Sequence, residues 1–218
     1  MKKRISIAVK QPTPPYRDGV KSIHTDTVAE TSELSLPGKR EIILKTALYL
    51  FTTQGFHATP TSQISKEAGI STGTLFHYFP DKNTLFEQLY LAIKKDMAKV
   101  VRDYDDPNLD SKHRLEQCFR GFVYWGVENP EKFLFIEQFC HSPSISESVK
   151  REAQAEFSWL SQIIDEDGRK GLLRDLPQEF YSVMVLQILF GVVKLISSGT
   201  TGLSSDEIIR AGLDMIWN

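Results

Sequence analysis

Apolar residues recur at helical spacing along most of the chain after residue 37. One stripe consists of apolar residues three or four positions apart: Ile43, Ala47, Leu50 and Phe51. A second stripe of the same kind consists of Leu85, Leu89, Ile93 and Met97. Side chains at this spacing lie on one face of an α-helix. We find no alternating run of apolar and polar residues between hairpin turns, as a strand would require, and we therefore predict an all-α fold.

Residues that cap free backbone groups mark the ends of the predicted helices. Gly55 is a candidate for the left-handed position that ends a helix, with Phe56 folding back onto that helix. Thr59, followed by Pro60, is predicted to begin a short helix, and Ser71 is predicted to begin another. These signals define three helices before residue 80.

Five further helices are predicted after a long helix that ends near Met97. Their approximate ranges are 110–128, 130–141, 144–167, 177–198 and 204–216. The pairs Ser144/Glu147 and Ser204/Glu207 have the spacing of capping boxes, which predicts that they begin the third and fifth of these helices.

The two short helices on either side of Gly69 predict a helix-turn-helix, because glycine allows the sharp turn between them. The second helix begins with four small residues: Ser71, Thr72, Gly73 and Thr74. Small side chains let a helix N-terminus approach a phosphodiester, whose anionic oxygens can accept hydrogen bonds from its free N–H groups. The alternative is a three-helix subdomain that binds nothing, and spacing alone does not decide between the two.

Charge is distributed unevenly along the chain. Residues 38–95 contain seven Lys/Arg and four Asp/Glu, whereas residues 96–218 contain thirteen and twenty. A basic segment in front of an acidic one is weak support for a front end that binds nucleic acid. The whole chain has a formal net charge of −2, so global basicity adds nothing to this interpretation.

The sequence argues against several other classes of protein. Two cysteines without a CxxC motif favour neither a disulfide scaffold nor a structural zinc site. The longest apolar stretch, residues 183–196, contains Gln187 and Lys194 and predicts no membrane span. The basic residues 1–4 precede an apolar run that is too short for a signal peptide. We expect a cytoplasmic protein with no metal and no cofactor.

Residues 38–90 resemble the N-terminal domain of TetR-family transcriptional regulators. The motifs that carry the resemblance, together with Lys82 and Leu85, are Gly55-Phe56, Ala68-Gly69-Ile70-Ser71, Gly73-Thr74-Leu75-Phe76 and Tyr78-Phe79. Two positions depart from the family pattern, because Ser65 replaces a more common alanine and Phe76 a more common tyrosine. Beyond residue 90 the resemblance is one of architecture, apart from residues 129–139.

The resemblance implies that this domain binds double-stranded operator DNA in the major groove. The residues that it assigns to DNA contact are Thr59, Thr61, Ser62, Ser71, Thr72, Gly73, Thr74, His77, Tyr78 and Lys82. Thr59 to Ser62 would face phosphate, Thr72 to Thr74 would lie against base edges, and Lys82 would pair with a phosphate. A solvent-exposed imidazole is the alternative for His77, and a packing aromatic is the alternative for Tyr78. Recognition of two half-sites implies a homodimer.

The resemblance further implies that the helical body binds a small molecule and forms the dimer. The residues assigned to a ligand pocket are Phe122, Tyr124, Trp125, Phe135, Gln138, His141, Trp159 and Gln187. The residues assigned to the dimer interface are Val183, Phe190, Val193, Ile209, Leu213 and Ile216. Both sets have a simpler alternative, since the same side chains could form the core of a single protomer.

These observations predict a ligand-responsive transcriptional regulator and not an enzyme. We expect a homodimer that represses from a palindromic operator and is released by a small apolar or amphipathic inducer. The alternatives are a helical small-molecule-binding protein or enzyme with a vestigial DNA-binding domain, and a regulator that acts only through protein contacts. The expected division is a poorly ordered extension over 1–37, a DNA-binding domain over 38–97 with its helix-turn-helix at about 60–79, and a ligand-binding and dimerisation domain over 98–218.

Overall fold

The computed structural model describes residues 38–167 and 178–216. Every regular element in these ranges is an α-helix, which confirms the predicted all-α fold. The expected extension over residues 1–37 lies outside the described residues. None of the described helices is both long and apolar enough to cross a membrane.

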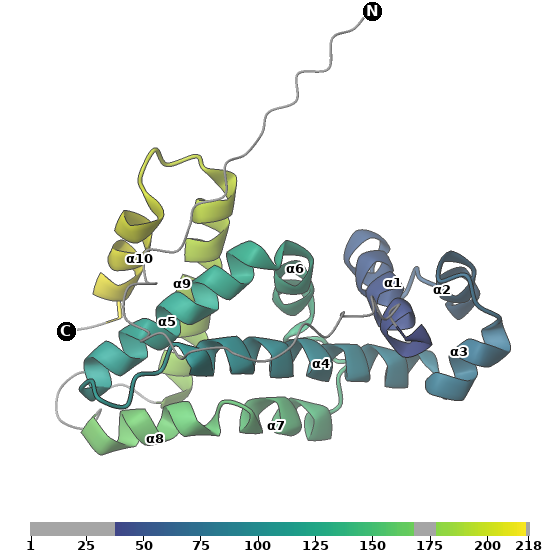
Figure 1. Ribbon diagram of the computed structural model, residues 1–218, viewed down its shortest axis with the longest axis horizontal. Coiled ribbons are helices and arrows are strands. Elements are labelled where there is room, and N and C mark those ends of the chain that lie inside the picture. The colour runs from purple at the N-terminus through teal and green to yellow at the C-terminus, as the bar shows by residue number, and fades with distance from the viewer. Residues whose placement is uncertain (1–37, 168–177, 217–218) are drawn as a thin grey trace, which may run out of the picture. The chain divides into compact units, whose positions relative to one another are not determined.

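Three helices pack beside the start of a long fourth one. They are α1 (Lys39–Gln54), α2 (Thr61–Glu67) and α3 (Thr72–Tyr78), and the long helix is α4 (Lys82–Asp103). Figure 1 shows α2 and α3 at one end of α4, with α1 next to them. The core that joins the four helices contains Ile43, Ala47, Leu50, Phe51, Ile64, Leu75, Phe79, Leu85 and Phe86, all buried.

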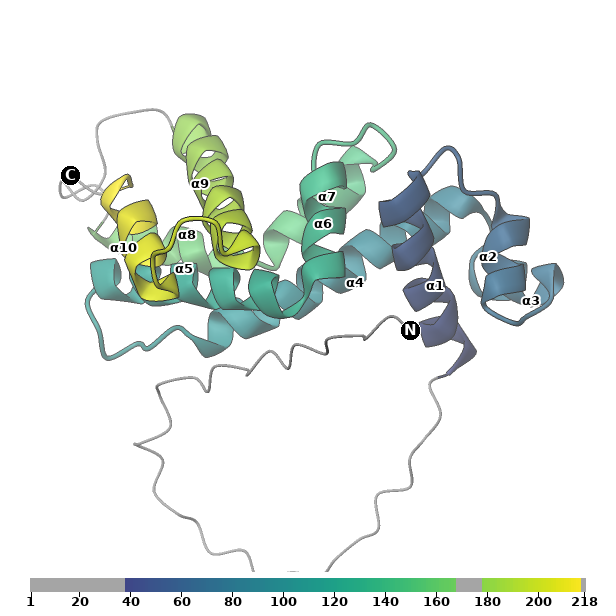
Figure 2. The same ribbon diagram turned by 90° about the horizontal axis from the view of Figure 1, so that it is seen from above.

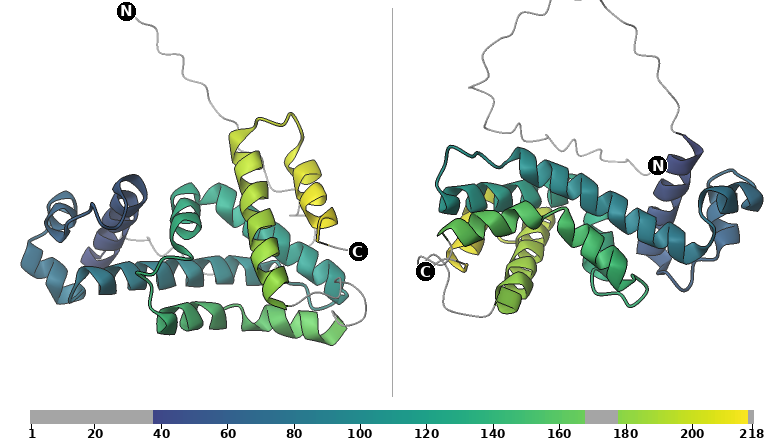
Figure 3. Two further views of the ribbon diagram at one scale, coloured as in Figure 1. Left: turned by 180° about the vertical axis from the view of Figure 1, so that it is seen from behind. Right: turned by 90° about the horizontal axis from the view of Figure 1, so that it is seen from below.

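Six further helices form the rest of the described chain. They are α5 (Ser111–Glu128), α6 (Pro130–Phe139), α7 (Glu147–Ala155), α8 (Ser158–Asp167), α9 (Gln178–Ser198) and α10 (Ser205–Asp214). Seen from above, α6 stands over the middle of α4, between α1 and α9 (Figure 2). Figure 3 shows α7 and α8 following one another alongside α4.

A cluster of aromatic rings joins the first helices to the rest of the structure. The ring of Phe86 on α4 lies 5.3 Å from that of Phe51 and 4.5 Å from that of Phe56, measured between centroids. On its other side it lies 5.3 Å from Phe135 and 5.1 Å from Phe139 of α6. Ring pairs in this range of distances are stabilising. The helix-turn-helix part and the body therefore share one core at this point.

Three of the predicted helix ends are confirmed. Gly55 ends α1 with a positive φ of 83°, although its ψ of 160° differs from the left-handed helical value, and Phe56 folds back to be buried. At α10, Ser204 and Glu207 form the predicted capping box, in which the backbone N–H of Ser204 donates to the Glu207 carboxylate over 2.8 Å. The Ser71 hydroxyl accepts from the backbone N–H of Thr74 at the start of α3.

The predicted helix over residues 144–167 is wrong. Helix α7 begins at Glu147, with Ser146 as its N-cap, and a turn at Glu156 and Phe157 separates it from α8. At this turn the backbone makes i to i+3 hydrogen bonds, and the Trp159 indole N–H donates to the carbonyl of Glu156 over 3.1 Å. The side chain therefore satisfies a carbonyl that a continuous helix would have bonded internally.

Candidate nucleic-acid interface

The N-terminal end of α3 is exposed and built from small residues. Ser71, Thr72 and Gly73 are exposed, and Thr74 is half-buried. The Ser71 hydroxyl accepts from the backbone N–H of Thr74 over 3.1 Å, and it lies 2.9 Å from the Thr74 hydroxyl. A Cβ added to Gly73 would meet only the Ser71 hydroxyl, 3.9 Å away. The chain thus presents an open, sterically undemanding backbone at this end of the helix.

The opposite face of α3 is anchored in the core. Leu75 and Phe79 are fully buried, so the orientation of the helix is fixed by packing. A second constraint comes from α2, where the buried Ser65 hydroxyl lies 3.1 Å from that of Thr72. Ser65 also donates to the carbonyl of Ser62 over 3.0 Å, which leaves the Thr72 hydroxyl as the donor to Ser65. In the sequence Ser65 stands out only as a departure from the family pattern, and the sequence analysis did not predict its contact with Thr72 across the turn.

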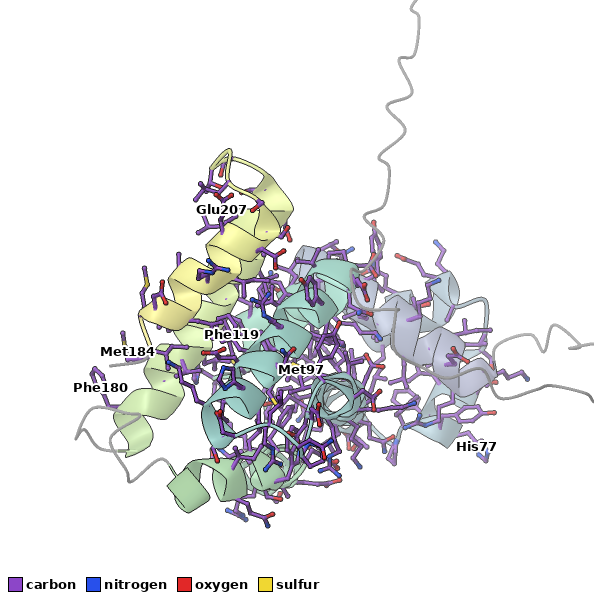
Figure 4. All side chains as sticks on the ribbon, turned by 60° about the vertical axis from the view of Figure 1, so that its left-hand side comes forward. His77, Met97, Phe119, Phe180, Met184 and Glu207 are labelled. Atoms are coloured by element: carbon purple, nitrogen blue, oxygen red, sulfur yellow. The ribbon has the colours of Figure 1, made fainter. Side chains whose placement is uncertain are left out.

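His77 and Tyr78 lie on the exposed side of α3 at its C-terminal end. Both side chains are exposed, and their rings meet edge to face with centroids 5.5 Å apart. In Figure 4 the labelled His77 lies at the outer limit of the structure and points away from the other helices. The predicted contacts of these two residues with DNA stay predictions, but the structure leaves both side chains accessible.

Thr59 does not occupy the position predicted for it. Its side chain is completely buried, and its hydroxyl donates to the carbonyl of Gly55 over 2.8 Å. Thr59 therefore closes the C-terminal end of α1, whereas Pro60 is the N-cap of α2. Of the other residues predicted near this helix start, Ser62 is exposed and Thr61 is half-buried. A buried hydroxyl with an internal partner cannot reach a phosphate, so we correct the assignment of Thr59.

Lys82 begins α4 close to α3. Its ammonium nitrogen lies 4.4 Å from the centroid of the Phe56 ring, a cation–π contact that restricts the side chain. Desolvation lowers the pKa of Lys82 below its usual value of 10.5. Asp81 caps the same helix, because its carboxylate accepts from the backbone N–H of Thr84 over 2.7 Å. A positioned ammonium group at this place is suited to pairing with a phosphate.

The eight residues predicted to form a ligand pocket differ in burial. Phe122, Trp125 and Phe135 are buried in the core, whereas Gln138, His141 and Gln187 are exposed. Tyr124 and Trp159 are half-buried. None of the eight lines the cleft between α1, α4 and α6 or the smaller hollow beside it, both described below.

Particular contacts explain why three of these aromatic residues form core. The Phe122 ring packs 6.3 Å from that of Phe190, and the half-buried Tyr124 ring stacks 6.1 Å from that of Tyr104. The indole N–H of Trp125 donates to Asp96 over 2.9 Å. Internal partners therefore account for the positions of these rings, which is the simpler of the two interpretations of their sequence pattern.

Most residues predicted for the dimer interface lie inside the protomer. Phe190, Val193, Ile209, Leu213 and Ile216 are buried. Phe190 packs against Phe133 at 5.5 Å, and Lys194 pairs with Glu137 of α6. Val183 differs, because this residue is 52% exposed. Phe190 and Val193 face α5 and α6, and side chains already buried within the protomer have little surface left for contact with a second copy of the chain.

Among the described residues, no group of three or more His, Cys, Asp or Glu side chains is arranged to hold a metal ion. The adjacent Cys140 and His141 are half-buried and exposed respectively. Burial raises the pKa of the Cys140 thiol, which disfavours the reactive thiolate.

Comparison with known families identifies the class of protein. Residues 43–89 match the family described as bacterial regulatory proteins, tetR family, and residues 89–218 match the tetracyclin repressor-like C-terminal domain. The second match alone covers more than half of the chain. The chain belongs to the TetR family and is a DNA-binding transcriptional regulator of the helix-turn-helix class.

Individual relatives agree with this assignment. The transcriptional repressor AcnR of Corynebacterium glutamicum is 26% identical over 178 residues, which cover 76% of this chain and 86% of AcnR. The transcriptional regulator UidR of Escherichia coli is 23% identical over 159 residues, covering 71% of this chain and 79% of UidR. A TetR family regulator from Shewanella sp. PV-4 superposes with a TM-score of 0.75 and 28% identity, over 84% of this chain and 100% of that one.

Proposed function

We propose that this chain represses transcription as a homodimer on a palindromic operator and is released by a small molecule. The observation that carries the proposal is the exposed N-terminal end of α3, which consists of small residues. Leu75 and Phe79 on the opposite side of the helix are buried and fix its orientation. In helix-turn-helix proteins the second helix reads the major groove with its N-terminal residues. Occupation of a promoter by such a protein blocks polymerase, which is why repression is the proposed outcome.

Dimerisation follows from how helix-turn-helix proteins read DNA. Two half-sites lie about 34–36 Å apart, or a multiple of that spacing, and need two recognition helices. The outward face of α9 supports a dimer better than the residues first assigned to it. Phe180, Met184 and Gln187 are exposed at intervals of four and three residues, and Leu195, eight residues after Gln187, is exposed as well. Figure 4 shows the labelled Phe180 and Met184 projecting away from the other helices.

Close approach of two α9 helices would be possible at Gly191. A Cβ added there meets nothing within 4 Å, so the space beside this glycine is open. Large apolar side chains around an open glycine are typical of a surface that packs against another helix. We therefore place the interface on the stripe Met184, Gly191 and Leu195, with Val183 at its edge.

The dimer is tested by a charged substitution in this stripe. Met184→Glu should convert the dimer to monomers in sedimentation velocity, because an isolated charge in an apolar interface costs several kcal/mol. Leu109→Glu is the matched control, since Leu109 is a comparably exposed apolar residue in the segment between α4 and α5. An intact Met184→Glu dimer would contradict this interface.

The whole proposal is tested by binding to DNA from upstream of the chain's own coding sequence. Wild-type protein should retard this DNA in a gel-shift assay, and Met184→Glu should fail to do so at the same concentration. A cellular reporter under the same promoter should rise when Met184→Glu replaces the wild type. A reporter that falls instead would reverse the proposed sign of regulation.

A further inference from the structure

A cleft of about 520 Å³ lies between α1, α4 and the start of α6. Its apolar lining comes from α1 and α4 and consists of Leu44, Leu48, Leu89, Ala92 and Ile93. Figure 2 shows the helices that contribute these residues, with α6 over α4 and beside α1. The cleft therefore lies between a helix of the DNA-binding domain and a helix of the body.

Acidic side chains predominate among the charged residues that line this cleft. The lining contains four carboxylates and two ammonium groups, which give it a formal net charge of −2. The carboxylates are those of Glu41, Asp96, Glu128 and Glu131, and the ammonium groups are those of Lys45 and Lys132. Lys132 is already committed to Asp96, at 2.7 Å. The three glutamates come from α1, α5 and α6, and in the described chain none of them forms an ion pair.

The pair between Asp96 and Lys132 forms part of one wall of the cleft. The Asp96 carboxylate also accepts the indole N–H of Trp125 over 2.9 Å. Burial opposes ionisation of Asp96, but the hydrogen bonds from Lys132 and Trp125 outweigh it and lower the pKa of Asp96. The charge of Asp96 is thus paired with Lys132 within the protein, and the unpaired negative charge along the cleft is that of the glutamates.

A second, smaller hollow adjoins the cleft. It measures about 270 Å³ and shares Lys45 and Glu131 with the first. Its other lining residues are Thr46, Tyr49 and Glu67, and Tyr49 is 52% exposed. An exposed aromatic ring beside carboxylates is a favourable surface for a cation, through the ring face as well as through charge.

We propose that the cleft binds a small amphipathic organic cation. The apolar lining would take the hydrophobic part, and Glu41, Glu128 and Glu131 would surround the positive charge. A pocket with apolar walls and a few convergent polar groups is the usual form of a small-molecule site. Binding of the cation to the cleft does not depend on the proposed function. Only the release of DNA by this ligand rests on it.

The position of the cleft gives such a ligand a way to act on α3. Helix α1 packs on α2 and α4, so a shift of α1 relative to α6 would move the recognition helix as well. A ligand that prefers one arrangement of these helices shifts the population toward it. By linkage, operator DNA must weaken cation binding by the same factor by which the cation weakens DNA binding.

The binding site is tested without DNA, using tetraphenylphosphonium as the probe. Titration of the full chain, followed by calorimetry and by tryptophan fluorescence, should show saturable binding. Tetraphenylborate has the same shape and the opposite charge, and it should bind at least about tenfold more weakly. Equal affinity for the two ions would overturn the assignment of charge recognition to this cleft.

Variants locate the site. Glu128→Gln and Glu131→Gln should each weaken tetraphenylphosphonium binding by about threefold to fivefold, as for solvent-accessible charge pairs. Lys45→Gln should strengthen it, because Lys45 repels the probe. Asp103→Asn removes an exposed carboxylate of α4 that lines neither hollow and should leave the affinity unchanged. If Asp103→Asn weakens binding as much as Glu131→Gln, the probe responds to overall charge and the site is refuted.

A bulky substitution tests the apolar lining independently. Ala92 is exposed on α4 within the cleft, so Ala92→Trp should fill the space and abolish probe binding while the fold is kept. Unchanged binding by this variant, with a wild-type circular dichroism spectrum, would overturn the proposal. If the probe binds as expected but operator DNA is not released, the site stands and its regulatory role under the proposed function is contradicted.

Discussion

The hydroxyl oxygens of Ser65 on α2 and Thr72 on α3 lie 3.1 Å apart, and this contact bridges the turn of the helix-turn-helix. Ser65 is buried, whereas Thr72 is exposed on the face predicted to meet DNA. The Ser65 side chain thus holds Thr72, the first residue of α3.

Removal of this contact should destabilise the protein without unfolding it. Ser65→Ala is expected to lower the free energy of unfolding by about 1 kcal/mol, the net value of a typical hydrogen bond. Ser62→Ala is the control, because Ser62 takes part in the contact only through its backbone carbonyl. Chemical denaturation should show the loss for Ser65→Ala and little change for Ser62→Ala. An equal loss for both variants would show that the Ser65 side chain contributes nothing specific.

Gly73 should separate stability from DNA binding. Gly73→Ala is expected to raise helix stability by at most about 0.5 kcal/mol, the lower end of the range for glycine within a helix, because Gly73 lies in the first turn of α3 and the added Cβ meets no close neighbour. The same methyl group would stand between the helix and the phosphodiester, so DNA affinity should fall. Thermal unfolding and a gel-shift assay measure the two effects.

Gly126→Ala provides the opposite case. A Cβ at Gly126 would lie 2.9 Å from a methyl carbon of Val193, so this variant should lose stability by about 1–3 kcal/mol through overpacking.

The outcome that would contradict the prediction for Gly73 is unchanged DNA affinity. If Gly73→Ala keeps full DNA affinity, the backbone of α3 does not approach DNA closely.

The residues around α3 should divide into two groups by their effect on DNA recognition. Lys82→Ala should weaken binding to operator and random DNA alike, because a phosphate contact carries no sequence information. Thr74→Ala and His77→Ala should change the preferred operator sequence, since these side chains are predicted to lie near base edges. Binding selection from a random DNA library measures both properties. Identical sequence preferences for all three variants would show that this division is incorrect.

Cys118 should be protected from alkylation in the native protein. Burial, reinforced by the nearby Asp105 carboxylate, raises the pKa of the Cys118 thiol to about 12, from an ordinary value of 9.0. At pH 9 the native thiol is therefore protonated, whereas the unfolded thiol is half ionised. Iodoacetamide should modify Cys118 slowly in native protein and rapidly in urea, as followed by mass spectrometry.

The same shift has a consequence for stability at high pH. The native state keeps a proton that the unfolded state loses, so the stability contributed by Cys118 is complete below pH 9 and is lost as the pH rises toward 12. The variant Cys118→Ala should therefore lose less stability than the wild type over this range. A parallel decline in both proteins would contradict the raised pKa.

Features fixed by a few neighbouring residues could be predicted from the sequence. Gly55 and the box formed by Ser204 and Glu207 were correct, because such caps depend on contacts within one turn of the chain. Leu75 and Phe79, four residues apart and therefore on one side of a helix, form the buried inner face of α3. Resemblance to a known family added the functional meaning of that helix.

Features that depend on tertiary packing were missed or misplaced. The burial of Phe190 depends on which face of α9 meets α5 and α6, and an apolar stripe fits both a protomer core and a dimer interface. Thr59 has the residue type of an N-cap, but its hydroxyl donates to the carbonyl of Gly55 at the end of the preceding helix. The cleft near Asp96 combines residues of α1, α4, α5 and α6, and no local pattern brings them together.

The central claim is that this chain binds specific DNA through α3, and one titration tests it most directly. Fluorescence anisotropy should be measured with the chain's own upstream DNA and with a scrambled duplex, over a series of salt concentrations. We expect tight binding to the upstream DNA, at least about a thousandfold weaker binding to the scrambled duplex, and log K falling with log[salt] at a slope of about −0.9 for each phosphate contact. Equal affinity for both duplexes, or an affinity that does not change with salt, would contradict the account.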